Sequence, residues 1–237
     1  MKKRIWELDA ARGVCILGMV LVHLVYDMTE LYPILDWQYP VWFAFIKEWG
    51  GVLFLLISGI CVTLGSRSVK RGCIVFACGL LCSAVTYGMY ALGFANKSII
   101  IYFGILHCLG TCMLLWYPLK KCPVWLLGVL GVGLTALGFY ITRIRVDFPW
   151  LIPFGVVYPG FASSDYFPLL PNFGFFLLGA VLGRRLYARK ETLLPKVNVC
   201  NPILGFLQSC GKHSLWIYLL HQPVLSAFCY LLTLLEV

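Results

Sequence analysis

Long apolar stretches, separated by short polar segments, dominate the hydrophobic pattern of this chain. Seven of them carry few or no charges and are close to the roughly 20 residues that an α-helix needs to cross a bilayer. Their approximate bounds are Ala10–Asp27, Trp49–Ser66, Gly72–Ala95, Ser98–Leu119, Cys122–Thr142, Tyr166–Gly183 and Ser214–Leu235. The pattern predicts an all-α polytopic membrane protein, a bundle of about seven transmembrane helices. Since no internal repeat or low-complexity linker interrupts it, we expect residues 1–237 to form a single transmembrane domain.

The composition excludes a water-soluble protein. Of the 237 residues, 61% are hydrophobic and only 12% are charged. Soluble domains have about 45–50% apolar and about 25% charged residues. A soluble globule could not bury that much apolar surface, so soluble, disordered and fibrous classes are all excluded.

The net charge of +9 follows the membrane topology. Fourteen of the 19 lysines and arginines lie in segments that fall on the same side of the membrane when the seven helices are threaded in order. By the positive-inside rule this side is the cytoplasm, so we expect a cytoplasmic N-terminus and an outer C-terminus. The prediction is a multi-pass protein of the cytoplasmic membrane that contacts the lipid bilayer and no nucleic acid. A monomer and a homodimer are both compatible with it.

Two outer connecting segments are longer than a tight bundle needs. Met28–Glu48 is expected to be an outer loop, with aromatic residues suited to the headgroup zone. Arg143–Asp165 is expected to be a second outer loop, because its three prolines break any helix. The cytoplasmic stretch Glu191–Lys212 mixes apolar and polar residues and is expected to lie flat on the membrane surface.

The cysteines give no signal for a metal site. The sequence has 11 of them, all in predicted spans or on the cytoplasmic side, and no CxxC motif. The closest pairs, Cys78/Cys82 and Cys108/Cys112, are each one helical turn apart. Free cysteines pack as small buried hydrophobes, so we predict neither a metal nor disulfides.

Ionisable residues form a stripe along the first predicted helix. Asp9, Arg12, His23 and Asp27 fall within one arc, since Arg12 and His23 differ by about 20° and Asp27 lies about 40° further round. Such groups at membrane depth cost roughly 2.5–3.5 kcal/mol each, which makes them candidates for function. A cation at the cytoplasmic end suits an anionic group, and a histidine one turn from a carboxylate suits a general base. The alternative is a structural Asp9–Arg12 pair with a hydrogen-bonded core histidine.

Later spans carry further polar candidates. His107 lies in the fourth span, and His221 and Gln222 lie in the seventh, where Pro223 frees a backbone carbonyl. Asp165 precedes the sixth span and is placed to cap that helix. A lone histidine on an apolar helix is often a hydrogen-bonded core residue, so both roles stay open for these positions.

At these residues the chain resembles a known family. The first span, ELDAARGVCILGMVLVHLVYDM, resembles the opening helix of the transmembrane acyltransferase superfamily. More specifically, it is similar to bacterial members of the heparan-alpha-glucosaminide N-acetyltransferase catalytic-domain family. Four more matching blocks follow in family order: LFLLISG, YFGILHCLG, SDYFPLLPNFGFFLLGAVLG and HSLWIYLLHQPVL.

The resemblance implies that acetyl-CoA, as the cytoplasmic acyl donor, transfers its acetyl group to an amine or hydroxyl on a sugar or envelope glycan at the outer side. Within this reading, Asp9 and Arg12 would bind the donor, with Lys2, Lys3 and Arg4 assisting at the CoA phosphates. His23 would be the general base, and Asp27 would fix its tautomer. The residues expected to contact the substrate are His107, Asp165, His221 and Gln222.

One departure from the family matters. Its lysosomal branch has a proposed catalytic histidine in the loop after the first helix, but Met28–Glu48 contains none, and Gln38 lies near the equivalent place. The lysosomal substrate is therefore not carried over. Two other functions stay open: a proton-coupled transporter with the same polar stripe, and a non-catalytic envelope scaffold. The absence of an inverted repeat disfavours a transporter.

Overall fold

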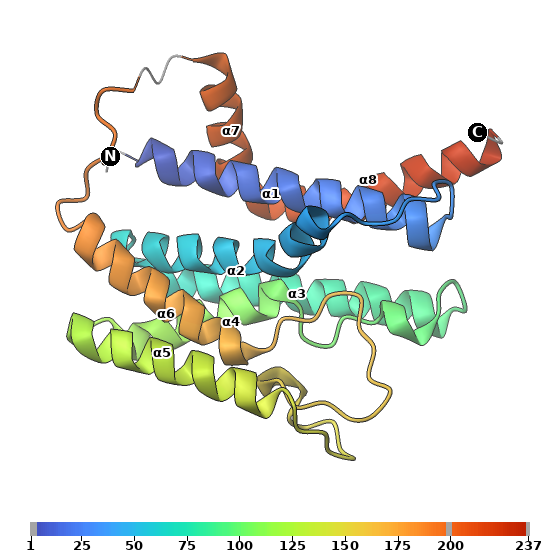
Figure 1. Ribbon diagram of the computed structural model, residues 1–237, viewed down its shortest axis with the longest axis horizontal. Helices are drawn as coiled ribbons and strands as arrows, with labels where there is room; N and C mark the ends of the chain where they lie inside the picture. Colours follow the sequence, from blue (N-terminus) through green and yellow to red (C-terminus); the bar gives the residue numbers. More distant parts are fainter. Residues whose placement is uncertain (1–3, 198–200, 236–237) are drawn as a thin grey trace. The chain divides into compact units, whose positions relative to one another are not determined.

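The computed structural model describes residues 4–197 and 201–235, and the regular structure of this part is helical (Figure 1). Its helices are α1 (Trp6–Tyr26), α2 (Val41–Leu64), α3 (Ser68–Ala91), α4 (Ile105–Leu119), α5 (Val124–Ile141), α6 (Leu169–Leu186), α7 (Pro202–Lys212) and α8 (Ser214–Leu234). A π-helical turn, Asp27–Leu31, continues α1. Each of the seven predicted spans overlaps one of these helices, which confirms the all-α class.

Six of the described helices are long and apolar enough to cross a membrane: α1 with its π-helical turn, α2, α3, α5, α6 and α8. The seventh, α4, has 15 residues. At 1.5 Å per residue it is about 22 Å long, against about 30 Å for a bilayer core. The predicted span Ser98–Leu119 was therefore too long, since its first part is a single 3₁₀ turn and an extended segment. The sides on which the two termini lie stay a prediction.

The prediction of a loop over Met28–Glu48 was partly wrong. The chain stays helical as far as Leu31, and α2 begins at Val41 rather than Trp49. Pro40 directly precedes α2, where a proline's fixed φ and missing N–H favour a helix start. The charges of Lys47 and Glu48, which suggested a loop, lie within the helix.

Contacts group the chain into two compact units, and the division falls inside α2. Unit 1 consists of Met1–Phe54 and Glu191–Val237, and its helices are α1, the first part of α2, α7 and α8. Unit 2 is Leu55–Lys190, with the rest of α2 and α3 to α6. That residues 1–237 form one transmembrane domain stays a prediction.

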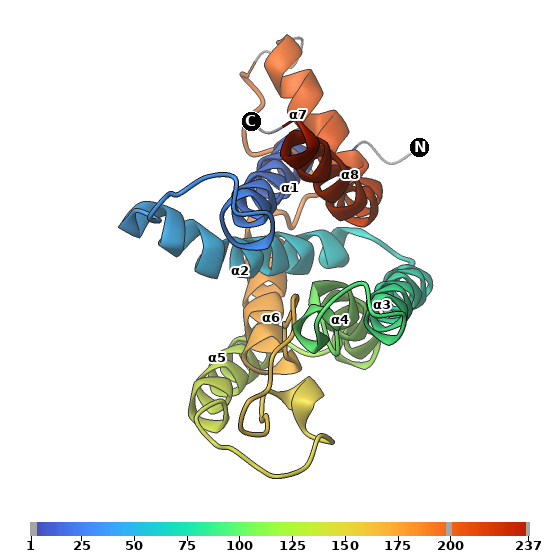
Figure 2. The same cartoon turned by 90° about the vertical axis from the view of Figure 1, so that its right-hand side faces the viewer.

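In unit 1, α8 runs along α1, and α7 also packs against α1 (Figures 1 and 2). The backbones of α1 and α7 touch at two glycines. A Cβ on Gly211 would lie 1.8 Å from the carbonyl oxygen of Asp9, and a Cβ on Gly13 would lie 2.0 Å from that of Leu207. Only glycine fits at either position.

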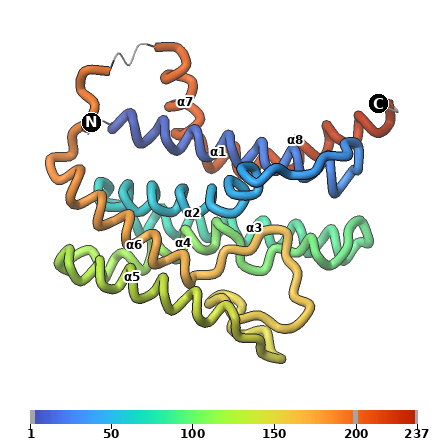
Figure 3. Tube along the Cα trace, viewed as in Figure 1, coloured from blue at the N-terminus to red at the C-terminus, as the bar shows by residue number. Residues whose placement is uncertain are grey.

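In unit 2, α3 pairs with α4 and α5 pairs with α6, as the chain trace shows (Figure 3). Small residues again allow the close approach, as is usual for helices in membranes. A Cβ on Gly174 of α6 would lie 2.2 Å from Oγ1 of Thr135 in α5. The fully buried side chains here include Leu55, Leu127 and Phe176.

Candidate functional site

Residues from the two ends of the chain meet between α1 and α8. Gln222 places its side-chain nitrogen 2.9 Å from each carboxylate oxygen of Asp27, and the ring centroids of His23 and His221 are 4.8 Å apart. We call these four residues the His–Asp cluster. The sequence had given His23 and Asp27 to catalysis and the other two to substrate binding, whereas the structure brings all four together.

Asp27 is fully buried and takes a different partner from the one expected. It begins the π-helical turn at the end of α1, a local deviation that is frequent at functional sites. Its hydrogen-bond donor is Gln222, not His23. The amide of Gln222 has two N–H groups and satisfies both oxygens, so Asp27 fixes α1 against α8 rather than the tautomer of His23.

His221 has one ring nitrogen bonded and the other free. Nδ1 contacts the backbone carbonyl oxygen of Tyr218, one turn earlier in α8. Nε2 is buried and has no hydrogen-bond partner among the described residues. The ring of the neighbouring His23 contacts that of His221, and no hydrogen bond from either His23 ring nitrogen is seen among the described residues.

Lys47 of α2 adds a positive charge near His23. Its ammonium lies 5.4 Å from the ring centroid of Tyr26 and 5.2 Å from that of Tyr39, two cation–π contacts. The hydroxyl of Tyr39 shares a hydrogen bond with Thr29 Oγ1 in the π-helical turn. Residues of Met28–Glu48, the segment predicted to be an outer loop, thus contact the end of α1. The Lys47 ammonium lies near the His–Asp cluster as a result.

At the other end of α1, the expected Asp9–Arg12 pair is absent from the described ion pairs. Asp9 is paired with Arg4 instead, at 2.9 Å and 3.0 Å. Arg12 points to α8, where its Nη2 donates to Ser214 Oγ at 2.8 Å. Its Nε is buried without a partner within residues 4–197 and 201–235. Arg4 is therefore engaged by Asp9, and the other two predicted helpers, Lys2 and Lys3, lie outside the described residues.

His107, in unit 2, has both ring nitrogens occupied. Nδ1 accepts a hydrogen bond from the backbone N–H of Gly104 at 3.2 Å, so Nε2 carries the proton. Nε2 faces Ser83 Oγ at 3.4 Å, and this hydroxyl donates to the carbonyl of Ile101 at 2.6 Å. The chain of hydrogen bonds is what a structural core histidine makes, the alternative that the sequence had left open.

Asp165 caps a helix, but not the one predicted. Its Oδ2 accepts from the backbone N–H of Ile105 at 3.0 Å, which places the carboxylate at the start of α4. The predicted target, α6, begins at Leu169 after Pro168. A carboxylate at a helix N-terminus satisfies a free N–H and stabilises the helix dipole. Gly104 leaves room for it, since a Cβ there would lie 2.1 Å from Oδ2.

Comparison with family models decides the relationship. Residues 4–223 of the 237 match the model described as heparan-alpha-glucosaminide N-acetyltransferase, catalytic. The chain belongs to this family. Comparison with curated proteins and with solved structures gave no match.

Membership of the heparan-alpha-glucosaminide N-acetyltransferase catalytic family places this chain among membrane acetyltransferases. The matched range contains the whole His–Asp cluster, as well as Arg12 and Asp165. The cluster combines two histidines, a carboxylate and an amide, groups that can hold and move protons. Within the described ranges, no group of three His, Cys, Asp or Glu is placed to hold a metal ion.

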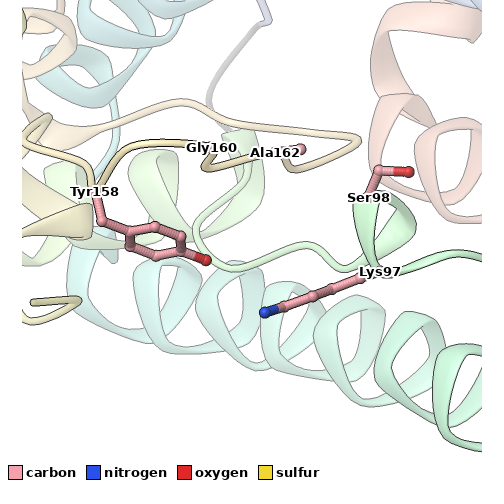
Figure 4. Close-up of a pocket in the computed structure, with 5 residues that line it drawn as sticks. All are labelled: Lys97, Ser98, Tyr158, Gly160 and Ala162. Atoms are coloured by element: carbon pink, nitrogen blue, oxygen red, sulfur yellow. The ribbon is translucent and has the colours of Figure 1, made fainter. Parts of the chain in front are cut away.

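This member of the heparan-alpha-glucosaminide N-acetyltransferase family also has a small pocket that the sequence did not predict. It has a volume of about 110 Å³ and is lined by Lys97, Ser98, Tyr158, Gly160 and Ala162. The ammonium of Lys97 and the hydroxyl of Tyr158 point toward the same gap (Figure 4). Tyr158 also lies beside Tyr102. Burial and this neighbour raise the pKa of Tyr102, so its phenol stays neutral. The three prolines of Arg143–Asp165 were the available signal, because they mark an ordered, non-helical loop.

Removal of the Asp165 carboxylate is expected to destabilise the protein. Asp165→Ala deprives the first turn of α4 of its acceptor, and loss of a helix cap costs about 0.5–2 kcal/mol. Asp165→Asn keeps a side-chain oxygen and is expected to lose less. Asp147→Ala, at an exposed aspartate in the same loop, is the control. The measurement is thermal unfolding of the detergent-purified variants, and equal loss for the Ala variants of both aspartates would contradict the capping role.

Proposed function

We propose that this protein transfers an acetyl or other short acyl group from acetyl-CoA to an amine or hydroxyl of a sugar or envelope glycan. Acetyl-CoA would be supplied from the cytoplasm and the acceptor from the outer side of the cytoplasmic membrane, with the N-terminus inside and the C-terminus outside. The observation that carries this proposal is the His23–His221 pair, two adjacent histidines inside the region that matches an acetyltransferase catalytic domain. It supplies the proton chemistry that the family reaction needs.

Arg12 is the residue that fits the donor best. One N–H of its guanidinium is used by Ser214, while the Nε–H is buried and unpartnered in the described structure. A phosphate oxygen of CoA would satisfy it with a charge-assisted hydrogen bond. Arg12 precedes His23 by 11 residues on α1, which is about 16 Å along the helix. The thioester supplies an activated acetyl carbon, and this chain has to hold the donor and move one proton.

Asp9 has a different place in this proposal from the one that the sequence suggested. Its carboxylate is held by Arg4 and its side chain is 8% exposed, so it positions Arg4 near the start of α1. Direct contact between Asp9 and an anionic donor would be repulsive. His107 and Asp165 likewise act on the fold of unit 2, since their polar atoms bond to the backbone around α4.

The proton chemistry takes place at the histidine pair. A histidine with a free lone pair takes the proton from the acceptor N–H or O–H as that atom bonds to the acetyl carbon. The same proton then goes to the sulfur when the C–S bond breaks, which yields CoA as a thiol. His23 is the base that the sequence favours. The Asp27–Gln222 hydrogen bonds hold α1 and α8 together and so keep the two rings in contact.

The first test is binding of the donor. Acetyl-CoA at 100 times its dissociation constant is expected to add about 2.7 kcal/mol of stability, an easily measured rise in the Tm of the purified protein. Arg12→Ala should lose this shift, whereas Arg145→Ala, at an exposed arginine of unit 2, should keep it. An adenine nucleotide alone serves as the ligand control.

The second test is transfer itself. Proteoliposomes are given radiolabelled acetyl-CoA and glucosamine, a probe acceptor with both amine and hydroxyl groups, on opposite sides of the membrane. Acetylated glucosamine is the expected product. Absence of any donor-induced shift up to millimolar acetyl-CoA would overturn the proposal and favour a transporter or scaffold.

A further inference from the structure

His221 has one ring nitrogen bonded to a backbone carbonyl and the other buried without a partner among the described residues. We infer that His221 Nε2, rather than His23, accepts the proton from the acceptor. The inference rests on the proposed function and assigns to one residue the role there given to the pair. His221 had been expected only to bind substrate.

The backbone of α8 sets the tautomer of His221. A carbonyl oxygen has no hydrogen to give, so the hydrogen bond between Nδ1 and Tyr218 O requires the proton on Nδ1. A neutral imidazole carries one ring proton, which leaves a lone pair on Nε2. The tautomer is therefore held by a helix carbonyl in the manner of a catalytic histidine oriented by a partner on its other nitrogen.

The free nitrogen is also in an unusual state for a buried group. Buried polar atoms are nearly always hydrogen-bonded, and an exception asks for an explanation. Nε2 of His221 is buried and has no partner among the described residues. An acceptor hydroxyl or amine that donates to this lone pair satisfies the atom and places the proton where the base needs it.

The other histidines at comparable depth do not combine these features. His107 has both nitrogens bonded, to Gly104 and Ser83, and so has no lone pair to offer. Unlike His221, whose Nδ1 is bonded to Tyr218 O, His23 has no hydrogen bond among the described residues to select a tautomer. The ring centroids of His23 and His221 are 4.8 Å apart, so the His23 ring helps to hold the His221 ring in position.

Proton and bond changes balance at this one atom. The acceptor's N–H or O–H bond breaks and its electrons form the bond to the acetyl carbon, while Nε2 takes the proton. His221 is then an imidazolium whose Nδ1–H still donates to Tyr218 O. When the C–S bond breaks, the sulfur takes the proton from Nε2 and the neutral ring is restored.

The tautomer is tested in the wild-type protein without any turnover. In ¹⁵N-histidine-labelled protein, NMR of the ring nitrogens of His221 is expected to show a protonated Nδ1 and an unprotonated Nε2. His221→Asn identifies the resonances by their loss. A protonated Nε2 and a bare Nδ1 would overturn the inference, whatever the activity of the protein.

The role in transfer is tested with a matched pair of variants. In His221→Asn the side-chain amide can still donate to Tyr218 O, as Nδ1 does, but nothing replaces Nε2. We expect its kcat for acetyl transfer to glucosamine to fall 10²- to 10⁴-fold, the usual value of a general base, with an unchanged Tm shift on acetyl-CoA. His23→Gln is expected to lose less than tenfold. If His221→Asn does not fold, His221→Gln takes its place.

The outcomes separate the two proposals. Transfer by His221→Asn within tenfold of wild type, or a greater loss in His23→Gln, overturns the inference and leaves the acetyltransferase proposal intact. If both variants lose kcat equally and by a large factor, the NMR experiment decides. An unprotonated Nε2 on His221 then supports the inference, and a protonated Nε2 overturns it. A wild-type protein that neither binds acetyl-CoA nor acetylates glucosamine overturns the proposed function itself.

Discussion

Gly211→Ala is expected to lower the free energy of unfolding by about 3 kcal/mol, the upper end of the usual cost of overpacking. The added Cβ would lie 1.8 Å from the carbonyl oxygen of Asp9 and 3.0 Å from the backbone nitrogen of Gly13. Both neighbours are backbone atoms of α1, which cannot rotate away as a side chain can. α7 would have to move off α1, and the contact that joins them in unit 1 would open.

Gly205→Ala is the matched control for Gly211→Ala, because both glycines are in α7. Nothing lies within 4 Å of the Cβ position at Gly205. Alanine inside a helix is better than glycine by roughly 0.5–1 kcal/mol, so this variant should gain stability. Thermal and denaturant unfolding of the detergent-purified variants measure both effects. The same sign of change at the two positions would show that α7 does not pack on α1 as described.

Gln222→Leu is expected to be about as damaging, at about 3 kcal/mol, because a buried acceptor left without its hydrogen-bond partner costs about 1–3 kcal/mol and a carboxylate falls at the upper end. Asp27 is fully buried, and both donors to its carboxylate come from Gln222. Leucine has a similar size but no N–H, so the carboxylate would lose its hydrogen bonds and keep its burial. Unfolding of the purified variant measures the loss.

A double substitution distinguishes loss of the hydrogen bonds from poor packing of the leucine. Asp27→Leu/Gln222→Leu removes both polar groups, and replacing a buried polar pair by apolar residues is often neutral or stabilising. We therefore expect the double variant to be more stable than Gln222→Leu. Gln208→Leu, at a half-buried glutamine of α7, controls for the change of residue type. A double variant that is less stable than Gln222→Leu would contradict the pairing of Asp27 with Gln222.

The membrane class and the helices were predictable because they depend on local composition. An uncharged stretch of about 20 residues identifies a membrane span from local sequence alone, without knowledge of the rest of the fold. Helix ends were less predictable. α2 starts before Lys47 and Glu48, whose charges hid the start. α4 starts at Ile105, where its cap, Asp165, comes from a distant part of the chain.

The candidate site was predictable residue by residue but not contact by contact. Helical periodicity puts His23 and Asp27 on one face of α1, yet it cannot show what α8 brings to that face. Gln222 is 195 residues from Asp27, and the amide displaces His23 as the partner of the carboxylate. Asp9 likewise lies one turn from Arg12 but bonds to Arg4, while Arg12 donates to Ser214 of α8.

The cap on α4 has a consequence for biosynthesis. Asp165 is 60 residues beyond Ile105, the residue whose N–H it accepts. At 5–20 residues per second, a ribosome needs about 3–12 s to add that stretch. During this time the acceptor for the first N–H of α4 does not yet exist. The N-terminal turn of α4 is therefore expected to reach its final form only after the Arg143–Asp165 loop has been made, and a nascent chain stalled before residue 165 is expected to lack this cap.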